Sequence, residues 1–279
     1  ELYKYFKDNY RNDEIDNVED KLKDGRKRSA ILHYCCGSYH KGNFGGVARF
    51  DYMLSLVFPN RIHFYGPKEK SKLLDYLSKN QDALVITDNH LACDIPNEYE
   101  VLLVHHGCAL TTAERNPKWG EPWKSLCTDG QKKMLHYRDP KTTTILSTAQ
   151  SCTDDFTKYF GDVYTKFKIK KLLHSSELPE GNIKTKWLKG RPIILGNVGA
   201  IKKGSNIFRS LSRKYKDYEF KEFHLNGNKD FNIFLKNKRN IYMNSDIYLQ
   251  LSNSEAGPYA SIDALLCGIP VVATNVGVF

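Results

Sequence analysis

The sequence predicts an α/β fold built from two doubly wound parallel-sheet domains. Short apolar runs that fit buried strands alternate along the chain with stretches of helical spacing, and this alternation is typical of parallel sheets covered by helices. The length of 279 residues fits about two domains, and a hydrophobic content of 41% is sufficient for packed cores.

Bulk properties narrow the class of protein further. Apolar runs fall short of the ~20 residues that a membrane-spanning helix needs, and the first 28 residues are charged throughout, unlike a signal peptide. Seven cysteines, an odd number without paired metal spacing, indicate reduced thiols. We therefore expect a cytoplasmic protein.

The net charge of +10 is concentrated in the second part of the chain. Residues 1–165 hold equal numbers of acidic and basic side chains, whereas residues 166–279 hold 19 basic and 9 acidic ones. This excess indicates an anionic partner, for which a diphosphate ligand, an anionic membrane surface and nucleic acid are candidates. Nucleic acid ranks low, because aromatic residues are not interleaved with the basic ones.

The predicted elements of the first part follow one another as strand, loop and helix. Residues 1–28 read as an N-terminal helical extension, residues 29–173 as the first domain, and residues 174–190 as a linker between domains. The predicted strands of this domain cover residues 29–35, 62–65, 83–87, 99–104 and 143–147, and its helices residues 47–59, 70–80 and 148–160. Residues 110–140 are predicted to form a long loop with one helix near Gln131.

Residues 191–279 form the predicted second domain. Its strands are expected at residues 193–195, 218–225, 247–251 and 271–273, and its helices at residues 205–215, 230–237 and 258–267, with a short separate piece at 241–244. The chain stops directly after the last strand, so we expect this domain to be incomplete.

The stretch from Asp246 to Thr274 carries the main functional signal. Its helix begins after a polar loop, and free N–H groups with the helix dipole make such a helix start receptive to phosphate. Pro258 has no N–H, so the donors would be Gly257, Tyr259 and Ala260. Two acids flank this place, Glu255 before the helix and Asp263 within it, and acids suit hydroxyls better than phosphate. A ligand with phosphate in its middle and hydroxyls at both ends is a nucleotide sugar.

This stretch closely resembles retaining glycosyltransferases of the GT-B fold, family 4. Their signature of two acids eight positions apart, followed by a Cys-Gly-x-Pro turn, stands here as Glu255, Asp263 and Cys267 to Thr274. The second acid is Asp where the family has Glu. The resemblance implies two Rossmann-like domains facing a cleft, with Glu255 holding sugar hydroxyls and Asp263 holding the ribose.

Two glycine motifs extend the resemblance. Gly45-Gly46 before a helix is similar to the family's first loop, which faces the donor diphosphate and the acceptor. Lys203-Gly204 matches half of the family's diphosphate clamp, Gly-Arg-x-x-x-x-Lys-Gly. The arginine is missing, since its position falls on Asn197 or Val198, and Lys202 or Arg209 is the candidate substitute.

The family also places a histidine near the transferred sugar, at the end of a parallel strand. His106 is the residue that we assign to this role, with His105 as the alternative, because the sequence does not fix the strand register. A histidine held only by backbone hydrogen bonds is the competing interpretation.

The resemblance implies a retaining transferase that moves a sugar from a UDP- or GDP-linked donor to a glycan or another hydroxyl acceptor. No cofactor is expected, and no metal ion, since the chain lacks an Asp-x-Asp pair and a helix dipole with a lysine can replace a cation. A non-catalytic nucleotide-binding module that partners an active enzyme is the alternative. The high Lys, Asn and Tyr content is compatible with a bacterial or large-virus source.

Overall fold

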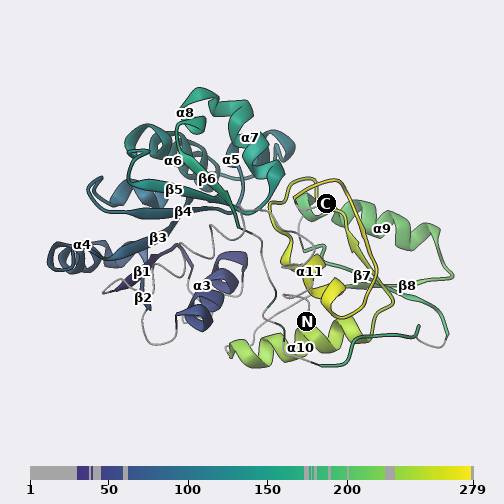
Figure 1. The fold of residues 1–279 in the computed structure, drawn as a ribbon. Helices are drawn as coiled ribbons and strands as arrows, with labels where there is room; N and C mark the ends of the chain where they lie inside the picture. The colour runs from purple at the N-terminus through teal and green to yellow at the C-terminus, as the bar shows by residue number, and fades with distance from the viewer. Residues whose placement is uncertain are drawn as a thin grey trace. The chain divides into compact units, whose positions relative to one another are not determined.

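The computed structural model describes residues 30–37, 39, 45–58, 62–172, 176, 178, 181–187, 190–199, 201–223 and 230–277. These residues form an α/β protein with two parallel sheets flanked by helices, which confirms the predicted fold class (Figure 1). The predicted N-terminal helical extension over residues 1–28 lies outside the described residues.

The chain divides into two compact units, each of which is described by itself. The first unit takes the chain up to Cys36 together with Leu54–His106 and Leu126–Leu173, and the second takes Gly37–Met53, Gly107–Ser125 and His174–Phe279. The second unit therefore contains two segments that lie within the predicted first domain. The predicted boundaries at residues 28, 173 and 190 stay predictions.

A six-stranded sheet in the order β2-β1-β3-β4-β5-β6 forms the centre of the first unit, and all its strand pairs are parallel. The strands are β1 (Ile31–Tyr34), β2 (Ile62–Tyr65), β3 (Leu84–Asp88), β4 (Val101–His105), β5 (Thr143–Ser147) and β6 (Lys168–Lys171). Its helical elements are η2 (Pro67–Glu69), α4 (Lys70–Lys79), η3 (Asn89–Asp94), α7 (Gln150–Phe160) and α8 (Asp162–Thr165). Every residue of β1, β3, β4 and β5 is buried, as expected of parallel strands covered on both faces.

The helix predicted near Gln131 is confirmed, but the long loop predicted around it over residues 110–140 is wrong. Helices α5 (Ala109–Arg115) and α6 (Trp123–Tyr137) occupy most of this range, and only residues 116–122 between them and residues 138–140 after them are irregular. The apolar spacing of α6 is weak in the sequence because one of its buried residues is polar. Gln131 is buried together with Met134 and Leu135, so the apolar stripe is shorter than the helix.

The second unit contains a four-stranded parallel sheet in the order β10-β9-β7-β8. Its strands are β7 (Ile193–Gly196), β8 (Glu219–Glu222), β9 (Ile247–Gln250) and β10 (Val271–Ala273). Its helical elements are η4 (Ile201–Lys203), α9 (Ser205–Lys214), α10 (Phe231–Met243) and α11 (Tyr259–Leu266), and α3 (Gly46–Val57) begins in this unit. The separate piece predicted at 241–244 is wrong, because α10 continues through Met243 with Phe234, Lys238 and Tyr242 buried at helical spacing.

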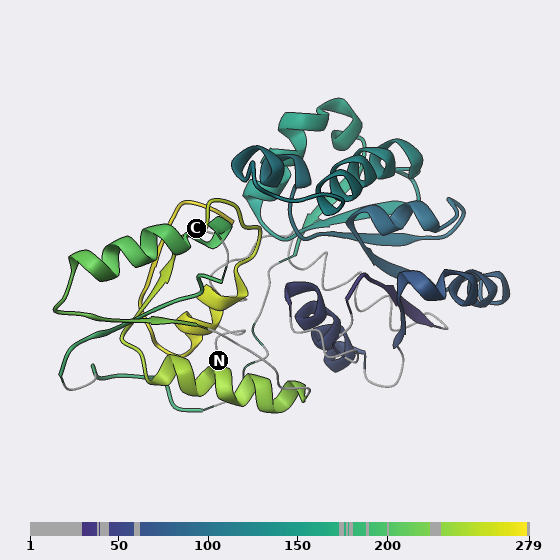
Figure 2. The same ribbon diagram turned by 180° about the vertical axis from the view of Figure 1, so that it is seen from behind.

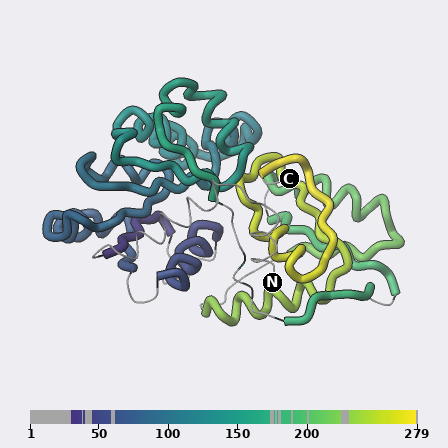
Figure 3. Tube along the Cα trace, viewed as in Figure 1, coloured from purple at the N-terminus to yellow at the C-terminus, as the bar shows by residue number. Residues whose placement is uncertain are grey.

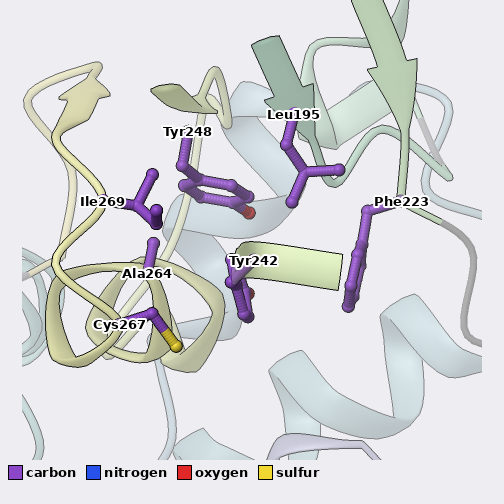
Figure 4. Close-up of a cluster of buried hydrophobic side chains, with 7 residues drawn as sticks. All are labelled: Leu195, Phe223, Tyr242, Tyr248, Ala264, Cys267 and Ile269. Carbon is purple, nitrogen blue, oxygen red and sulfur yellow. The ribbon is translucent and has the colours of Figure 1, made fainter. Parts of the chain in front are cut away.

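Residues next to each other in β7 and β9 face opposite sides of this sheet. Ile194 and Leu249 pack with Phe208 of α9. Leu195 and Tyr248 pack on the other side, in a cluster with Tyr242 of α10 and with Ala264, Cys267 and Ile269 (Figure 4). Helices α9 and α10 accordingly lie on opposite faces of the sheet in both views (Figures 1 and 2).

Both sheets contain the same topological device. In each sheet the first strand of the chain, β1 or β7, lies inside the sheet. The second strand, β2 or β8, lies on one side of it, and the third and fourth strands lie on the other side. Open α/β sheets bind ligands beyond the carboxyl ends of the two strands at which this direction reverses. The two places to inspect are therefore the ends of β1 and β3 and the ends of β7 and β9; the chain traces of these segments can be followed in Figure 3.

Two further facts bear on the predicted setting. None of the seven cysteines, all of which lie among the described residues, is paired in a disulfide. Among the described residues, the helices are all too short or too polar to cross a bilayer.

Candidate functional site

The loops that follow β7 and β9 meet at the switch point of the second unit. The backbone N–H of Asn253 donates to the carbonyl of Lys202 at 3.0 Å, which ties the loop after β9 to η4. Gly204 then begins α9 with a φ of 79°, and a Cβ there would collide with the carbonyl oxygen of Leu251. Glycine is required at this position both by the left-handed backbone and by the close approach of the two loops.

Lys203 and Glu255 come together at this junction. The ammonium of Lys203 donates to the Oε1 carboxylate oxygen of Glu255, and the two side chains stay 26% and 14% exposed. Because both groups remain partly open to solvent, each of them can give up the other as its partner and bind a ligand instead. The structure thus brings together Lys203, which was predicted to hold the donor diphosphate, and Glu255, which was predicted to hold the sugar hydroxyls.

A buried amide beside this ion pair was not predicted. Gln250, the last residue of β9, donates from Nε2 to the Ser252 hydroxyl at 2.6 Å, and its Oε1 accepts from the Ser261 hydroxyl at 3.1 Å. The same Nε2 lies 3.5 Å from Oε1 of Glu255. The amide therefore links the strand end, the loop with Glu255 and helix α11. The sequence feature that could have pointed to this residue is an amide side chain at the carboxyl end of an otherwise apolar strand.

The start of α11 lies against the start of α3. A Cβ placed on Gly46 would stand 3.7 Å from the ring of Tyr259, the first residue of α11. Within α11 the first helical hydrogen bond runs from the N–H of Ser261 to the carbonyl of Pro258 at 2.9 Å. The N–H groups of Tyr259 and Ala260 precede that bond, as do those of other helix starts.

Asp263 lies in the interior of the second unit. Its side chain is fully buried, and Oδ2 and Oδ1 accept hydrogen bonds from the Arg49 guanidinium at 2.9 and 2.8 Å. Lys238 forms an ion pair with it, and the Ser176 hydroxyl donates to it at 2.5 Å. Burial alone would raise the pKa of this carboxyl, but the charges of Lys238 and Arg49 outweigh it and hold the pKa below its usual range. A ribose hydroxyl could reach Asp263 only by displacing one of these partners, and the ribose role stays a prediction.

The two candidate substitutes for the missing clamp arginine lie in different surroundings. Arg209 is engaged by Glu222 of β8, with Nε 2.9 Å from the carboxylate. Lys202 precedes Lys203 directly, and its side chain is exposed. Of the two positions where the arginine could have stood, Val198 is buried in the core beside Phe208 and Asn197 is half-buried.

The two histidines at the end of β4 lie in the first unit and differ in environment. His105 is buried and stacks on Phe156 with ring centroids 4.0 Å apart. Burial, with a smaller effect of His106, lowers the pKa of His105 to about 3, so this ring is neutral. His106 is 12% exposed, and its Nε2 lies 2.9 Å from Oδ1 of Asp88.

These contacts favour His106 over His105 for any chemistry at this strand end. Burial on its own would raise the pKa of Asp88, but His106 and His33 outweigh it and hold that pKa below its usual range. Asp88 had no predicted role, although a carboxylate at the end of a buried strand was a usable signal.

Parallel sheets of six and four strands flanked by helices are consistent with the two Rossmann-like domains of the GT-B class of α/β proteins. Residues 193–279 match the model of the family described as Glycosyl transferases group 1, a stretch that runs from β7 to the end of the chain. This match supports a glycosyltransferase of the GT-B type. The curated proteins contain no match to the chain.

Proposed function

We propose that the protein is a retaining glycosyltransferase that transfers a sugar from a nucleoside-diphosphate sugar to a glycan or another hydroxyl acceptor. The contact between Lys203 and Glu255 carries the proposal. Charge on the leaving diphosphate is the main barrier to such a transfer, so a fixed cation beside the phosphates contributes most to lowering it. The carboxylate of Glu255 is the partner of that cation in the structure.

Donor binding would exchange these partners. The diphosphate takes the ammonium of Lys203, and Glu255 turns to the hydroxyls of the sugar, where a carboxylate is a good hydrogen-bond acceptor. Gln250 lies within 3.5 Å of Glu255 and limits how far the carboxylate moves. The exchange costs little because a partly exposed ion pair contributes only ~0–1 kcal/mol.

The helix starts complete the proposed donor site. The N–H groups of Gly257, Tyr259 and Ala260 face the diphosphate at the beginning of α11, and Gly45-Gly46 leaves room for the sugar because it carries no side chains. His106 would act near the reacting carbon. The donor nucleotide is uridine or guanosine diphosphate, and the reaction proceeds without a cofactor or a metal ion at the diphosphate.

The first experiment measures thermal stability of the purified protein against a panel of nucleoside diphosphates, followed by a mass-spectrometric screen of the matching nucleotide sugars. We expect one nucleoside diphosphate to raise the melting temperature and its sugar to be transferred or hydrolysed. Binding of a nucleotide without any turnover across the panel would contradict the enzyme and leave the binding module.

Variants separate the two roles in the ion pair. Lys203→Gln should weaken nucleotide binding at least about tenfold, since a charge-assisted contact of ~1.5–3 kcal/mol is lost. Glu255→Gln should leave nucleotide affinity within a few-fold and abolish most turnover. Lys221→Gln is the matched control, because Lys221 pairs with Glu219 at 3.1 Å on the exposed part of the same unit. An equal loss of affinity in the control would indicate general charge and not a site.

The alternative function is a non-catalytic nucleotide-binding module that partners an active enzyme. The absent clamp arginine favours it, because half of the charge that stabilises the leaving group is missing and Arg209 is engaged by Glu222. Adding the arginine back by Asn197→Arg distinguishes the two: a faster transfer supports a weakened enzyme, and continued lack of turnover with intact binding supports the module.

A further inference from the structure

The switch point of the first unit holds a second cluster of chemically active side chains. His33 is in β1, Cys35 follows that strand, and Asp88 ends β3. In the register of these strands His33 pairs with Ile86 and Tyr34 with Thr87, so Cys35 comes opposite Asp88. Side chains alternate along a strand, and the three therefore point to the same face of the sheet.

The structure places one donor atom from each of His33, Cys35 and Asp88 within 4.8 Å of the other two, and all three side chains are buried. We propose that these residues bind a divalent transition-metal ion of the zinc type. Imidazole nitrogen, thiolate sulfur and carboxylate oxygen are the three kinds of ligand that zinc takes in proteins. With bonds of ~2.0–2.3 Å, three such donors around one ion lie ~3.3–3.8 Å apart, so no donor pair has to contract by more than ~1–1.5 Å.

The charges of the cluster balance those of the ion. The thiol of Cys35 loses its proton to solvent on binding, and the resulting thiolate and the carboxylate of Asp88 neutralise the two positive charges. His33 binds as the neutral ring. Three protein ligands leave a fourth position for a water molecule.

The second observation is the state of Asp88. Its Oδ2 atom is buried and has no hydrogen-bond partner within the described part of the chain, while Oδ1 lies 2.9 Å from Nε2 of His106. An unpartnered buried carboxylate oxygen is costly, and a cation would satisfy it. Ligating carboxylates are commonly fixed by such an outer hydrogen bond, which is the contact that His106 supplies.

The competing explanation is an ion pair between a protonated His33 and Asp88. Nε2 of His33 lies 3.7 Å from Oδ1 of Asp88, a distance compatible with a loose pair. Such a pair would not involve Cys35 and would not bind a metal ion. The role of the proposed site is to join the ends of β1 and β3.

The test uses the whole chain with its purification tag removed and its metal stripped by a chelator. Titration with Zn²⁺ against a chromophoric chelator should give one ion per chain, and Co²⁺ should give visible bands with a thiolate-to-cobalt charge-transfer band. Cys35→Ser should remove the charge-transfer band and lower Zn²⁺ affinity at least about tenfold. Cys152→Ser is the matched control, because Cys152 is also buried in the first unit and should leave both unchanged.

A wild-type chain that binds neither ion at one equivalent overturns the proposal, and so does a charge-transfer band that survives Cys35→Ser. If the Cys35→Ser chain does not fold, alkylation of the wild-type thiols decides. Zn²⁺ should slow alkylation at Cys35, assigned by fragmentation of the peptide that it shares with the exposed Cys36, and not alkylation of the peptide containing Cys152. Equal rates at Cys35 with and without Zn²⁺ refute the site. Turnover of any nucleotide sugar has no bearing on either result.

Discussion

Replacing Asp263 by asparagine tests whether this acid belongs to the core of the second unit or to the ribose of a donor. The change keeps the size of the side chain and removes its charge. Arg49 and Lys238, which are 3% and 4% exposed, would then be buried without their counter-charge. Breaking a buried ion pair from one side costs ~3–5 kcal/mol, because the remaining charges keep their desolvation penalty.

The measurement is urea unfolding at neutral pH, with nucleotide affinity read on the same samples. A domain has ~5–15 kcal/mol of stability in total, so Asp263→Asn should unfold at a much lower urea concentration or not fold. The triple change of Asp263, Arg49 and Lys238 to leucine, methionine and methionine should recover most of the loss, since an apolar replacement of a whole buried charge cluster is often neutral. The reasoning is refuted if Asp263→Asn unfolds like the wild type and loses only its affinity for nucleotide.

Three further predictions concern stability. The pKa of the His105 ring is about 3 in the folded state and about 6.5 in the unfolded state. Between these values the unfolded state binds more protons, so the free energy of unfolding of the wild type falls as the pH drops. His105→Phe removes this group and should make the free energy of unfolding less dependent on pH in that range. Urea unfolding at pH 7 and pH 4.5 checks this, and an unchanged difference between the two contradicts it. Gly204→Ala should cost at least ~1–2 kcal/mol, measured as a lower melting temperature, because the left-handed backbone is strained for alanine and the new Cβ meets the carbonyl of Leu251. Asp230→Ala should cost ~1 kcal/mol, also by melting, since Asp230 caps α10 by accepting from two backbone N–H groups, and a neutral result would show that the cap contributes nothing.

The order of strands and helices was largely predictable because it depends on local patterns. Strands β2, β5 and β10 have the bounds that their apolar runs indicate, and the ends of α11 follow from Pro258 and Gly268. The extents of two helices were mispredicted, and both helices contain a buried polar or charged residue. A buried Gln131 in α6 and a buried Lys238 in α10 interrupt the apolar stripe, so the sequence indicated a helix near Gln131 within a long loop in one case and a shorter helix in the other.

The contents of the site were predictable only in part, since local motifs do not reveal distant partners. Lys203 was assigned because Lys203-Gly204 resembles the family's diphosphate clamp, and Glu255 because it precedes a helix start and belongs to the family's acid signature. The partner of Asp263 was not found, because Arg49 is 214 positions away in sequence. Cys35 and Asp88 were missed for the same reason: their pairing depends on the register of β1 against β3, which the sequence does not fix.

The two acids of the Glu255–Asp263 motif differ in a way that follows from burial. Glu255 is 14% exposed and shares its cation with solvent, so its ion pair contributes at most ~1 kcal/mol and can be exchanged for a ligand. Asp263 is fully buried between two cations, and separating it from them costs several times more. A ligand that binds reversibly can therefore be held by Glu255. Asp263 could hold one only if the core were reorganised. The motif thus combines one acid that is available to a substrate with one that fixes α11 against α3 and α10, and α11 is the helix whose first turn the proposed donor site uses.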